Sequence, residues 1–353
     1  MTRRPIGATA AVVATVALVA LVRARPAAAD PPVPTDYRST VDAIEPVADG
    51  VRAEVVGGDA FLELTVGRGR QVVVTGYQGE PYLRFRPDGT VQRNRRSPAT
   101  YVNDSRDATA EVPDSADPDA DPDWETVADG GAYNWHDHRI HWMGSERPDG
   151  AQPGEWTRPW AVDIEVDGTP TRITGTLALV DGVNPLPWVA LGLAAAAGVV
   201  IAGRRRPLVV APVAVLVAAA LATVVGWAQR ADAPAGSGAN PLLVAVPLAG
   251  VAAAGLGITV GRRMGRRAVA ATALAAAAAV AGWGLLRLDV LTKPVLPTVL
   301  DAWLDRAGTT LALGLALASA GLVIWGSGVV VTDGYENESE AGTAVTVAGG
   351  DRR

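Results

Sequence analysis

The chain contains no cysteine, and Lys293 is the single lysine among its 31 basic residues. The absence of cysteine excludes disulfide bonds, thiolate metal sites and a cysteine nucleophile. The net charge of −6 is modest, and no basic face with interleaved aromatic residues indicates a nucleic-acid partner. The short motifs of serine hydrolases, phosphate-binding loops and dinucleotide-binding folds are also missing from the polar part of the chain. We therefore expect a protein that is not an enzyme.

Charged residues are scarce in the second half of the chain, and this scarcity divides the sequence. Of the 353 residues 49% are hydrophobic, but they are concentrated between positions 186 and 331, while residues 30–184 are polar and rich in Asp, Arg and Gly. A chain of this length can hold two domains. The composition predicts one polar domain and one membrane domain.

The first 29 residues have the order of a secretory signal. Arginines near the N-terminus precede an apolar run from Ile6 to Val22, and small residues follow up to Ala29, where we expect cleavage. Arg23 and Arg25 lie between the apolar run and this position, which is unusual for a signal. The alternative is an uncleaved first anchor helix, because about 17 apolar residues nearly span a bilayer. Both interpretations place the following segment outside the cell.

Five further apolar runs are long enough to span a bilayer and predict a transmembrane helical bundle at 185–331. They are Leu186–Gly203, Leu208–Ala228, Leu242–Val260, Ala268–Leu286 and Thr309–Val331.

Arginine-rich connections orient these spans. Arg204–Arg206 join the first two spans and Arg262–Arg267 join the third and fourth, and such loops are expected on the cytoplasmic side. The chain is then a multi-pass protein of the cell membrane. Residues 30–184 lie outside the cytoplasm, and residues 332–353 form a disordered cytoplasmic tail.

The predicted spans contain no charged residue and no histidine, which disfavours a proton-coupled pump. Small residues such as Gly257 and Gly261 suit close helix packing, so a compact anchor in the lipid bilayer is expected. A pore for a neutral solute is the alternative, since Pro212 and Pro247 fall inside spans where they would kink helices.

The polar part predicts an extracytoplasmic all-β sandwich of immunoglobulin or cupredoxin type. Short alternating runs are separated by turn signals such as Asp88-Gly89 and Asp167-Gly168. The expected strands are Val51–Val56, Phe61–Val66, Gln71–Tyr77, Tyr82–Arg86, Thr90–Arg93, Trp160–Val166 and Thr171–Val180.

All three histidines of the chain fall within WHDHRIHWM, which begins at Trp135. In a regular strand His136 and His138 share one face, at a spacing of about 7 Å, and His141 points away. In a helix His138 and His141 share a face instead. A common site for all three imidazoles therefore requires a turn or bulge near residues 139–140.

Such a cluster predicts a transition-metal site with His136, His138, His141 and Met143 as ligands. Imidazoles suit Zn(II) and Cu(II), and the thioether of Met143 adds a preference for copper. Asp137 and Arg139 would surround the ligands, with the Asp137 carboxylate accepting a ring N–H. The alternatives are histidines that only stabilise a tryptophan-rich face beside an Asp137–Arg139 ion pair, and a zinc-bound water for catalysis.

Two further stretches, GYQGEPYLRF and NRRSPATYVN, are dense in tyrosine, arginine and asparagine. They predict a recognition surface for an envelope protein, with ordinary hairpin and loop chemistry as the alternative. Its candidate residues are Tyr77, Glu80, Tyr82, Arg84, Arg95 and Arg96.

Through WHDHRIHWM and these two stretches, the chain resembles a set of uncharacterised exported membrane proteins of actinobacteria, which imply no activity. It is more distantly similar in architecture to copper-resistance proteins of the CopC type, which are small histidine-containing β-sandwiches. This chain has no intramembrane histidine and no histidine near the mature N-terminus. The resemblance is one of architecture, so it favours copper among the candidate metals without implying a function or copper transport.

The sequence thus predicts a membrane-anchored extracytoplasmic protein that binds a metal ion, copper rather than zinc, and handles or senses it. The alternative is a non-enzymatic cell-envelope interaction protein with an envelope protein as its partner. In that case the clustered histidines are structural.

Overall fold

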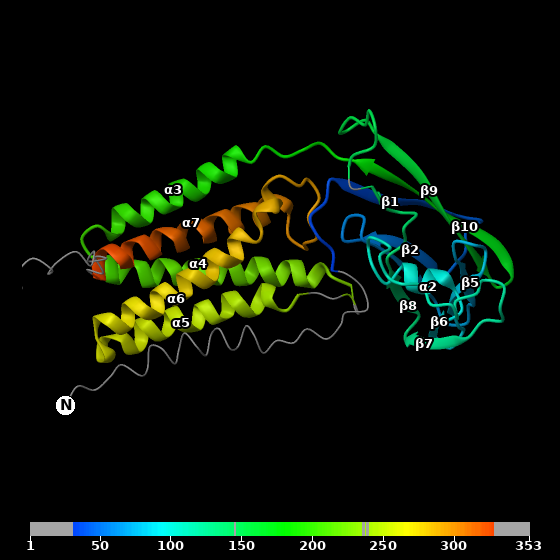
Figure 1. Cartoon of the computed structure of the whole chain (residues 1–353), viewed down its shortest axis with the longest axis horizontal. Coiled ribbons are helices and arrows are strands. Elements are labelled where there is room, and N and C mark those ends of the chain that lie inside the picture. Colours follow the sequence, from blue (N-terminus) through cyan, green and yellow to red (C-terminus); the bar gives the residue numbers. More distant parts are fainter. Residues whose placement is uncertain (1–30, 145, 235–236, 238–239, 328–353) are drawn as a thin grey trace, which may run out of the picture.

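The computed structural model describes residues 31–327, except residues 145, 235–236 and 238–239 (Figure 1). A β-rich part is followed by five long helices that lie side by side. The segments predicted as a signal or anchor and as a cytoplasmic tail, 1–29 and 332–353, fall outside the described residues.

The β domain, residues 31–184, contains ten strands in two antiparallel sheets. The larger sheet has seven strands in the order β1-β10-β9-β4-β5-β6-β7, and the smaller has the order β2-β3-β8. The strands are β1 (Tyr37–Glu45), β2 (Val51–Val56), β3 (Phe61–Val66), β4 (Val72–Thr75), β5 (Pro81–Phe85), β6 (Val91–Asn94), β7 (Trp124–Ala128), β8 (Ala132–Trp135), β9 (Thr157–Val166) and β10 (Thr169–Leu179).

The two sheets enclose one hydrophobic core. Leu62 and Leu64 of the smaller sheet belong to the same buried cluster as Val162 and Ile164 of the larger one. Strand β9 alternates between buried and exposed residues along most of its length, because one face packs on the core and the other meets solvent. The prediction of a β-sandwich-like domain before the helices is therefore confirmed, while the immunoglobulin or cupredoxin type stays a prediction.

Local chemistry fixed the hairpins that the sequence predicted. Asp167 and Gly168 both have positive φ, 49° and 82°, in the two-residue connection between β9 and β10. Asp and Gly tolerate this conformation better than other residues, and it matches the twist of the paired strands. Each of the seven expected strands overlaps an observed one, with β2 and β3 beginning and ending where predicted.

Three strands and one short helix were not predicted. Strand β1 pairs with β10 through a bulge between Val41 and Ala43, and its outward residues are polar. Strands β7 and β8 are five and four residues long, too short for a clear alternation. A five-residue helix, α2 (Pro98–Val102), begins where the Ser97 hydroxyl accepts a hydrogen bond from the Ala99 N–H.

The five long helices are apolar and long enough to cross a membrane. The prediction of five such segments is confirmed, and exposed apolar side chains on them are compatible with a lipid environment. They are α3 (Leu186–Gly203), α4 (Pro207–Asp232), α5 (Leu242–Met264), α6 (Arg266–Leu285) and α7 (Ala302–Ser327), with a short 3₁₀ turn, η1 (Leu288–Leu291), between the last two.

The start of α7 corrects the sequence prediction. The helix begins at Ala302 instead of Thr309, so it carries Asp305 and Arg306 into the bundle. Arg287 follows α6 and forms an ion pair with Asp305 at 2.7 Å, with both side chains buried. The expectation of a bundle without internal charge is therefore wrong at the end that lies near the β domain.

Glycines set the helix separations, as the sequence predicted. A Cβ atom at Gly257 or Gly261 of α5 would overlap Thr272 or Val269 of α6. At the contact between α3 and α7, a Cβ atom at Gly314 would overlap the carbonyl oxygen of Gly192. Small residues permit such approaches between membrane helices.

Replacing Gly314 by alanine should therefore weaken the packing of α3 on α7. We expect a destabilisation of about 1–3 kcal/mol, because backbone atoms cannot move aside as a flexible side chain can. Thermal unfolding of the purified chain measures the effect. Gly321→Ala in the same helix is the control, since nothing lies within 4 Å of its added Cβ atom. Equal midpoints for both variants would contradict the close approach.

The connection between α6 and α7 pairs with the β domain. Thr35, just before β1, and Val295 exchange two backbone hydrogen bonds, of 3.0 and 3.2 Å. Next to this bridge, Lys293 forms an ion pair with Asp36 at 2.8 Å. We call these two contacts the domain tie. The guanidinium of Arg306 continues it into the bundle by donating to the carbonyl oxygen of Lys293 at 2.7 Å.

Candidate functional site: the histidine segment

The histidine segment, residues 135–143, begins at the last residue of β8 and leaves the sheet in a turn. The Ile140 N–H donates to the carbonyl oxygen of Asp137 at 3.0 Å and closes this turn. Ile140 itself is fully buried, so the turn is anchored in the core. The turn lies where the sequence required one for the histidines to approach each other.

His136 lies in the core of the β domain. Its ring stacks on Phe61 with centroids 4.2 Å apart, and its Nδ1 donates to the carbonyl oxygen of Ala60 at 2.6 Å. The residue is 1% exposed. This imidazole therefore joins the histidine segment to the turn between β2 and β3.

His138 and His141 lie next to each other. Their ring centroids are 5.1 Å apart, and the ring planes are nearly perpendicular. Nε2 of His138 donates to the Ser105 carbonyl at 3.0 Å, and Nε2 of His141 donates to the Arg106 carbonyl at 3.2 Å. Both rings therefore hold the loop that follows α2, and both Nδ1 atoms carry a lone pair in this tautomer.

Asp137 is completely buried, and Trp135 and Arg139 hold its carboxylate. Arg139 donates to its carboxylate from Nε and Nη2 at 2.8 and 2.7 Å, and the Trp135 indole N–H donates at 2.9 Å. Burial by itself raises the pKa of the Asp137 carboxyl, but the charge and hydrogen bonds of Arg139 outweigh it and lower the pKa below its ordinary value. Asp137 is thus ionised and occupied by Arg139 and Trp135 instead of orienting an imidazole.

Arg139 and Tyr77 connect the segment to the β4–β5 hairpin. The Arg139 guanidinium lies over the Tyr77 ring, 5.0 Å from its centroid, and donates to the Thr75 carbonyl at 3.2 Å. The Tyr77 hydroxyl donates to Asn103 Oδ1 at 2.5 Å and accepts the His138 N–H at 2.9 Å. The histidine segment therefore holds several loops of the domain together.

An unpredicted ion pair adjoins the histidines. Asp59 is buried and pairs with Arg106 at 2.8 Å. Burial raises the pKa of the Asp59 carboxyl in spite of this arginine. Burial, and next the charge of Arg106, lower the pKa of His141 to about 3. Neither Asp59 nor Arg106 belongs to a recognisable motif, because they are 47 positions apart in the sequence.

These contacts limit what the predicted metal ligands can do. Among the described residues, no group of three or more His, Cys, Asp or Glu side chains has the arrangement of a metal site. Met143 is 43% exposed and ends the segment on the surface. The Nδ1 atom of His141 is buried and has no hydrogen-bond partner. The pair of His138 and His141 is the part of the predicted site that the fold brings together.

The neutral, buried state of His141 predicts an acid-sensitive domain. Its pKa falls from about 6.5 in the unfolded chain to about 3 in the folded one, so the unfolded state binds the proton first as the pH decreases. Between pH 7.5 and 5 this residue should remove about 2 kcal/mol of stability. Denaturant unfolding at both pH values should show a smaller loss for His141→Gln than for the native chain. Met143→Gln, a neighbouring exposed change, should keep the native loss; the same loss in all three proteins would refute the assignment.

The predicted recognition surface is only partly exposed. Glu80 and Tyr82 are 3% and 2% exposed, so they are interior residues, and this part of the prediction is corrected. Glu80 accepts the Ser97 hydroxyl at 2.6 Å and fixes the start of α2. Arg84 is held by Gln92 at 2.6 Å and stacks on Trp124.

The other predicted recognition residues lie nearer the surface. Tyr77 is 36% exposed. Arg95 forms an exposed ion pair with Asp123 at 2.8 Å, and Arg96 donates to the Ser115 carbonyl at 3.2 Å. These arginines hold the acidic loop before β7. This contact explains their presence without a binding partner.

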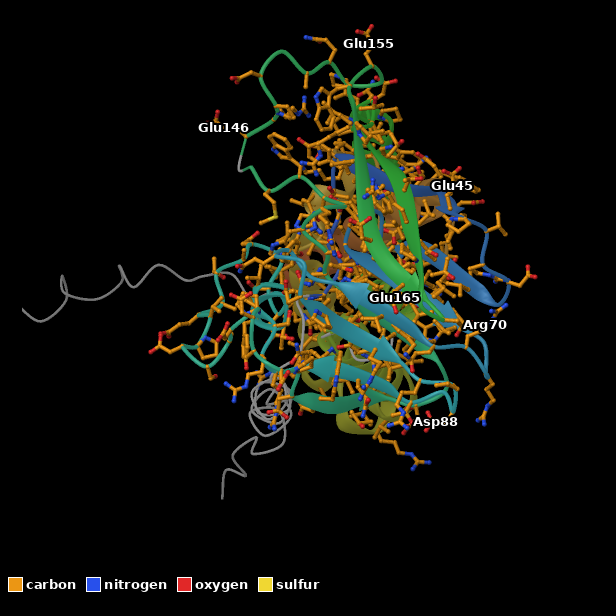
Figure 2. The ribbon with its side chains drawn as sticks, turned by 90° about the vertical axis from the view of Figure 1, so that its right-hand side faces the viewer. Glu45, Arg70, Asp88, Glu146, Glu155 and Glu165 are labelled. Atoms are coloured by element: carbon orange, nitrogen blue, oxygen red, sulfur yellow. The ribbon has the colours of Figure 1, made fainter. Side chains whose placement is uncertain are left out.

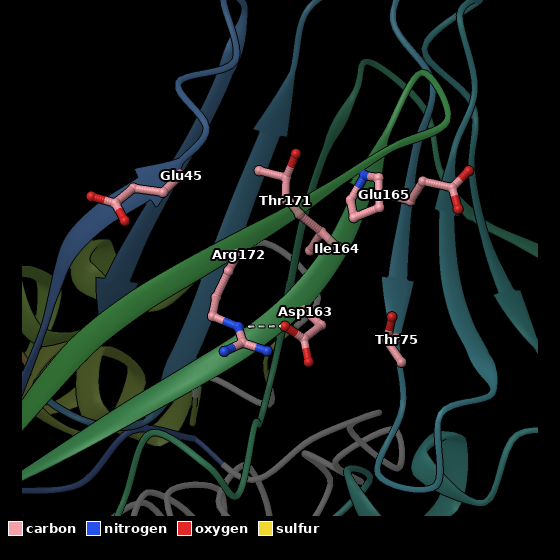
Figure 3. Close-up of a pocket in the computed structure, with 8 residues that line it drawn as sticks. Glu45, Thr75, Asp163, Ile164, Glu165, Thr171 and Arg172 are labelled. Atoms are coloured by element: carbon pink, nitrogen blue, oxygen red, sulfur yellow. Dashed lines mark hydrogen bonds and ion pairs between the residues drawn. The ribbon is translucent and has the colours of Figure 1, made fainter.

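The larger sheet leaves one face open to solvent, which we call the open face. It carries Glu45, Asp163, Glu165 and Arg172 around a hollow formed by β1, β4, β9 and β10, and Arg172 donates to Asp163 at 2.6 Å (Figure 3). Figure 2 shows Glu45 and Glu165 on the domain, with Glu146 and Glu155 on the long connection between β8 and β9. The open face is polar, and no second layer covers it among the described residues.

No family model, no curated protein and no solved structure matches this chain. The fold and the site define a coarse class, which is a multi-helix membrane protein with a β-sandwich-like domain. The resemblances drawn from the sequence stay predictions.

Proposed function

We propose that the protein is a non-enzymatic cell-envelope interaction protein that binds an envelope protein outside the cytoplasm. The domain tie is the observation that carries this proposal. A simple anchor needs only the short segment between β10 and α3, but here a second connection pairs with Thr35 and Asp36 of the β domain. A domain held at two points keeps a fixed orientation towards its partner.

The orientation in the membrane follows from the arginine-rich loops. Arg204–Arg206 and the arginines at the end of α5 and the start of α6 lie at the end of the bundle far from the β domain. In the proposed topology these loops are cytoplasmic, and the β domain is extracytoplasmic.

The histidine segment supports a structural role for its imidazoles. Each of the three rings donates to a main-chain carbonyl, from Ala60, Ser105 and Arg106. The Asp137 carboxylate forms an ion pair with Arg139 and does not orient an imidazole. The open face, with Asp163 and Arg172, then offers the polar groups for a partner.

Photocrosslinking in the native cell envelope tests the binding proposal. A photoreactive residue in place of Asp163 on the open face should give a discrete crosslinked product with another envelope protein. The same residue in place of Arg52, which is exposed on the smaller sheet, is the control. Products of equal yield from both positions, or none from either, would refute the open face as the binding site.

Paired cysteines test the domain tie, and the cysteine-free chain makes the experiment clean. Thr35 and Val295 form a hydrogen-bonded antiparallel pair, whose Cα separation of about 5.5 Å suits a disulfide. The Thr35→Cys/Val295→Cys protein should oxidise readily in its native membrane, as a mobility shift reversed by reductant shows. Thr40→Cys/Val295→Cys should stay reduced. Similar oxidation of both pairs would mean that the domain is not held as described.

A second candidate function is the handling of a metal ion, copper rather than zinc. The lone pairs on Nδ1 of His138 and His141 favour it, because their Nε2 atoms donate to carbonyls as metal-bound histidines commonly do. The positive charge of Arg106 close by acts against a bound cation. Met143 and His136 would need to move to complete the predicted ligand set.

Titration calorimetry of the full chain with Cu(II), Cu(I) and Zn(II) separates the two candidates. If the interaction proposal is right, His138→Ala should bind these ions no more weakly than the native chain does. The metal proposal expects one ion per chain, lost in His138→Ala and retained in Met143→Leu if the thioether is not a ligand. If the native chain binds no metal ion and His136→Ala strongly lowers the stability of the metal-free protein, the histidines are structural.

A further inference from the structure

Two arginine-rich loops meet at the end of the bundle that lies far from the β domain. Arg204–Arg206 connect α3 to α4, and the second group lies in the last turn of α5 and the first turn of α6, on either side of Gly265. The side chain of Pro207, at the start of α4, lies against Gly326 near the end of α7. Arg266 donates to the carbonyl oxygen of the same Gly326 at 3.4 Å. The contacts with Gly326 therefore bring both loops to one side of the bundle.

Among the described residues, the exposed arginines of these loops form no ion pair with a carboxylate. We call this set the arginine collar. No Asp or Glu occurs at positions 182–231 or 233–288 of the sequence. Within the described part of the chain, no ion pair involves the collar. Its members with described, exposed side chains are Arg204, Arg205, Arg206, Arg263, Arg266 and Arg267.

Exposed apolar side chains adjoin the collar. Ile201 in the last turn of α3 is 60% exposed, and Val209 in the first turn of α4 is 61% exposed. Trp325, next to Gly326, is 65% exposed. A ligand that fits this surface has an anionic head for the guanidiniums and an apolar chain for the helix faces.

We propose that the arginine collar binds the phosphates of anionic phospholipids in the leaflet opposite the β domain. Guanidinium groups form paired hydrogen bonds with phosphate oxygens, and basic pockets at the ends of membrane helices bind lipid headgroups. Two adjacent loops with three exposed arginines each suit a headgroup with two phosphates, as in cardiolipin. This inference does not depend on the partner proposed for the β domain.

Native mass spectrometry of the full chain with added cardiolipin, phosphatidylglycerol or phosphatidylcholine tests the proposal. We expect cardiolipin to be retained, phosphatidylglycerol less so, and phosphatidylcholine not above background. Each arginine replaced by glutamine should weaken binding about fivefold. Arg204→Gln/Arg205→Gln/Arg206→Gln and Arg266→Gln/Arg267→Gln should therefore both lose most of the bound cardiolipin. Arg52→Gln/Arg68→Gln, two exposed arginines of the β domain, should retain it.

Thermal unfolding supplies the second measurement. Cardiolipin should raise the midpoint of the native chain, and inorganic phosphate at the same phosphate concentration should not. An equal rise with inorganic phosphate would indicate a site for free anions and overturn the proposal. If a glutamine variant fails to fold, the corresponding lysine variant keeps the charge and should bind with reduced affinity. Full cardiolipin binding by both folded glutamine variants would also overturn the proposal.

Discussion

Replacing Asp137 by asparagine should destabilise the β domain by about 3–5 kcal/mol, because the change breaks a buried ion pair and leaves one partner uncompensated. The Asp137 side chain is 0% exposed and that of Arg139 is 22% exposed, so water cannot replace the lost carboxylate charge fully. Arg139 would still have to hold the Thr75 carbonyl and cover Tyr77. Denaturant unfolding followed by tryptophan fluorescence measures the loss.

A double variant identifies the cause. Adding Arg139→Met to Asp137→Asn removes the stranded charge and should recover part of the stability. Arg95→Gln is the control, because its ion pair with Asp123 is exposed and should be worth at most about 1 kcal/mol. No recovery in the double variant would show that the carboxylate acts mainly through Trp135 or backbone contacts.

Acid titration checks the same carboxylate independently. Since the pKa of Asp137 is lower in the folded chain than its ordinary value, its contribution is present above about pH 4 and is lost as the pH falls through the folded pKa. The stability difference between the native chain and Asp137→Asn should therefore shrink in acid. A difference that stays constant down to pH 2 would contradict an ionised Asp137.

Replacing Asp305 by asparagine should have a comparable effect on the helical bundle, about 3–5 kcal/mol. Arg287 and Asp305 are 6% and 1% exposed in their side chains. Arg287 also donates to Gln229 and lies over Trp283, 4.9 Å from the ring centroid. Loss of the carboxylate leaves a buried guanidinium without a counter-charge where α4, α6 and α7 meet.

The thermal midpoint of the full chain in detergent measures this loss. Two further variants serve as comparisons. Arg287→Met/Asp305→Leu should recover much of the midpoint, since apolar side chains then replace both members of the buried ion pair. Asp301→Asn, an exposed change just before α7, should leave it unchanged. Because Arg306 joins this region to Lys293, the Asp305 variant should also slow disulfide formation between cysteines at positions 35 and 295. Normal oxidation would mean that the ion pair and the domain tie are independent.

Local patterns determined much of the fold. Alternation and Asp-Gly turns define strands because one face of each strand packs on the core and the turn residues accept positive φ. Long apolar runs define the helices because a bilayer core requires about 20 such residues. Strand β1 and the short strands β7 and β8 could not be predicted, since their backbone hydrogen bonds depend on partners far along the chain.

The histidine segment shows where sequence reasoning stops. The order of residues located the three imidazoles and showed that a common site requires a turn near residues 139–140. The sequence could not show that each imidazole would donate to a main-chain carbonyl, because Ala60, Ser105 and Arg106 lie 33 or more positions away from their histidine partners.

The sequence by itself therefore determined the two-part organisation, the turn chemistry and the five apolar helices, all of which follow from short-range patterns. Only the tertiary structure decided that Glu80 and Tyr82 are interior, that Asp305 and Arg287 share a buried ion pair, and that the β domain is tied to the bundle. These features depend on which distant segments come together. Burial and charge pairing depend on the distances in space between residues, and the order of residues in the sequence does not give those distances.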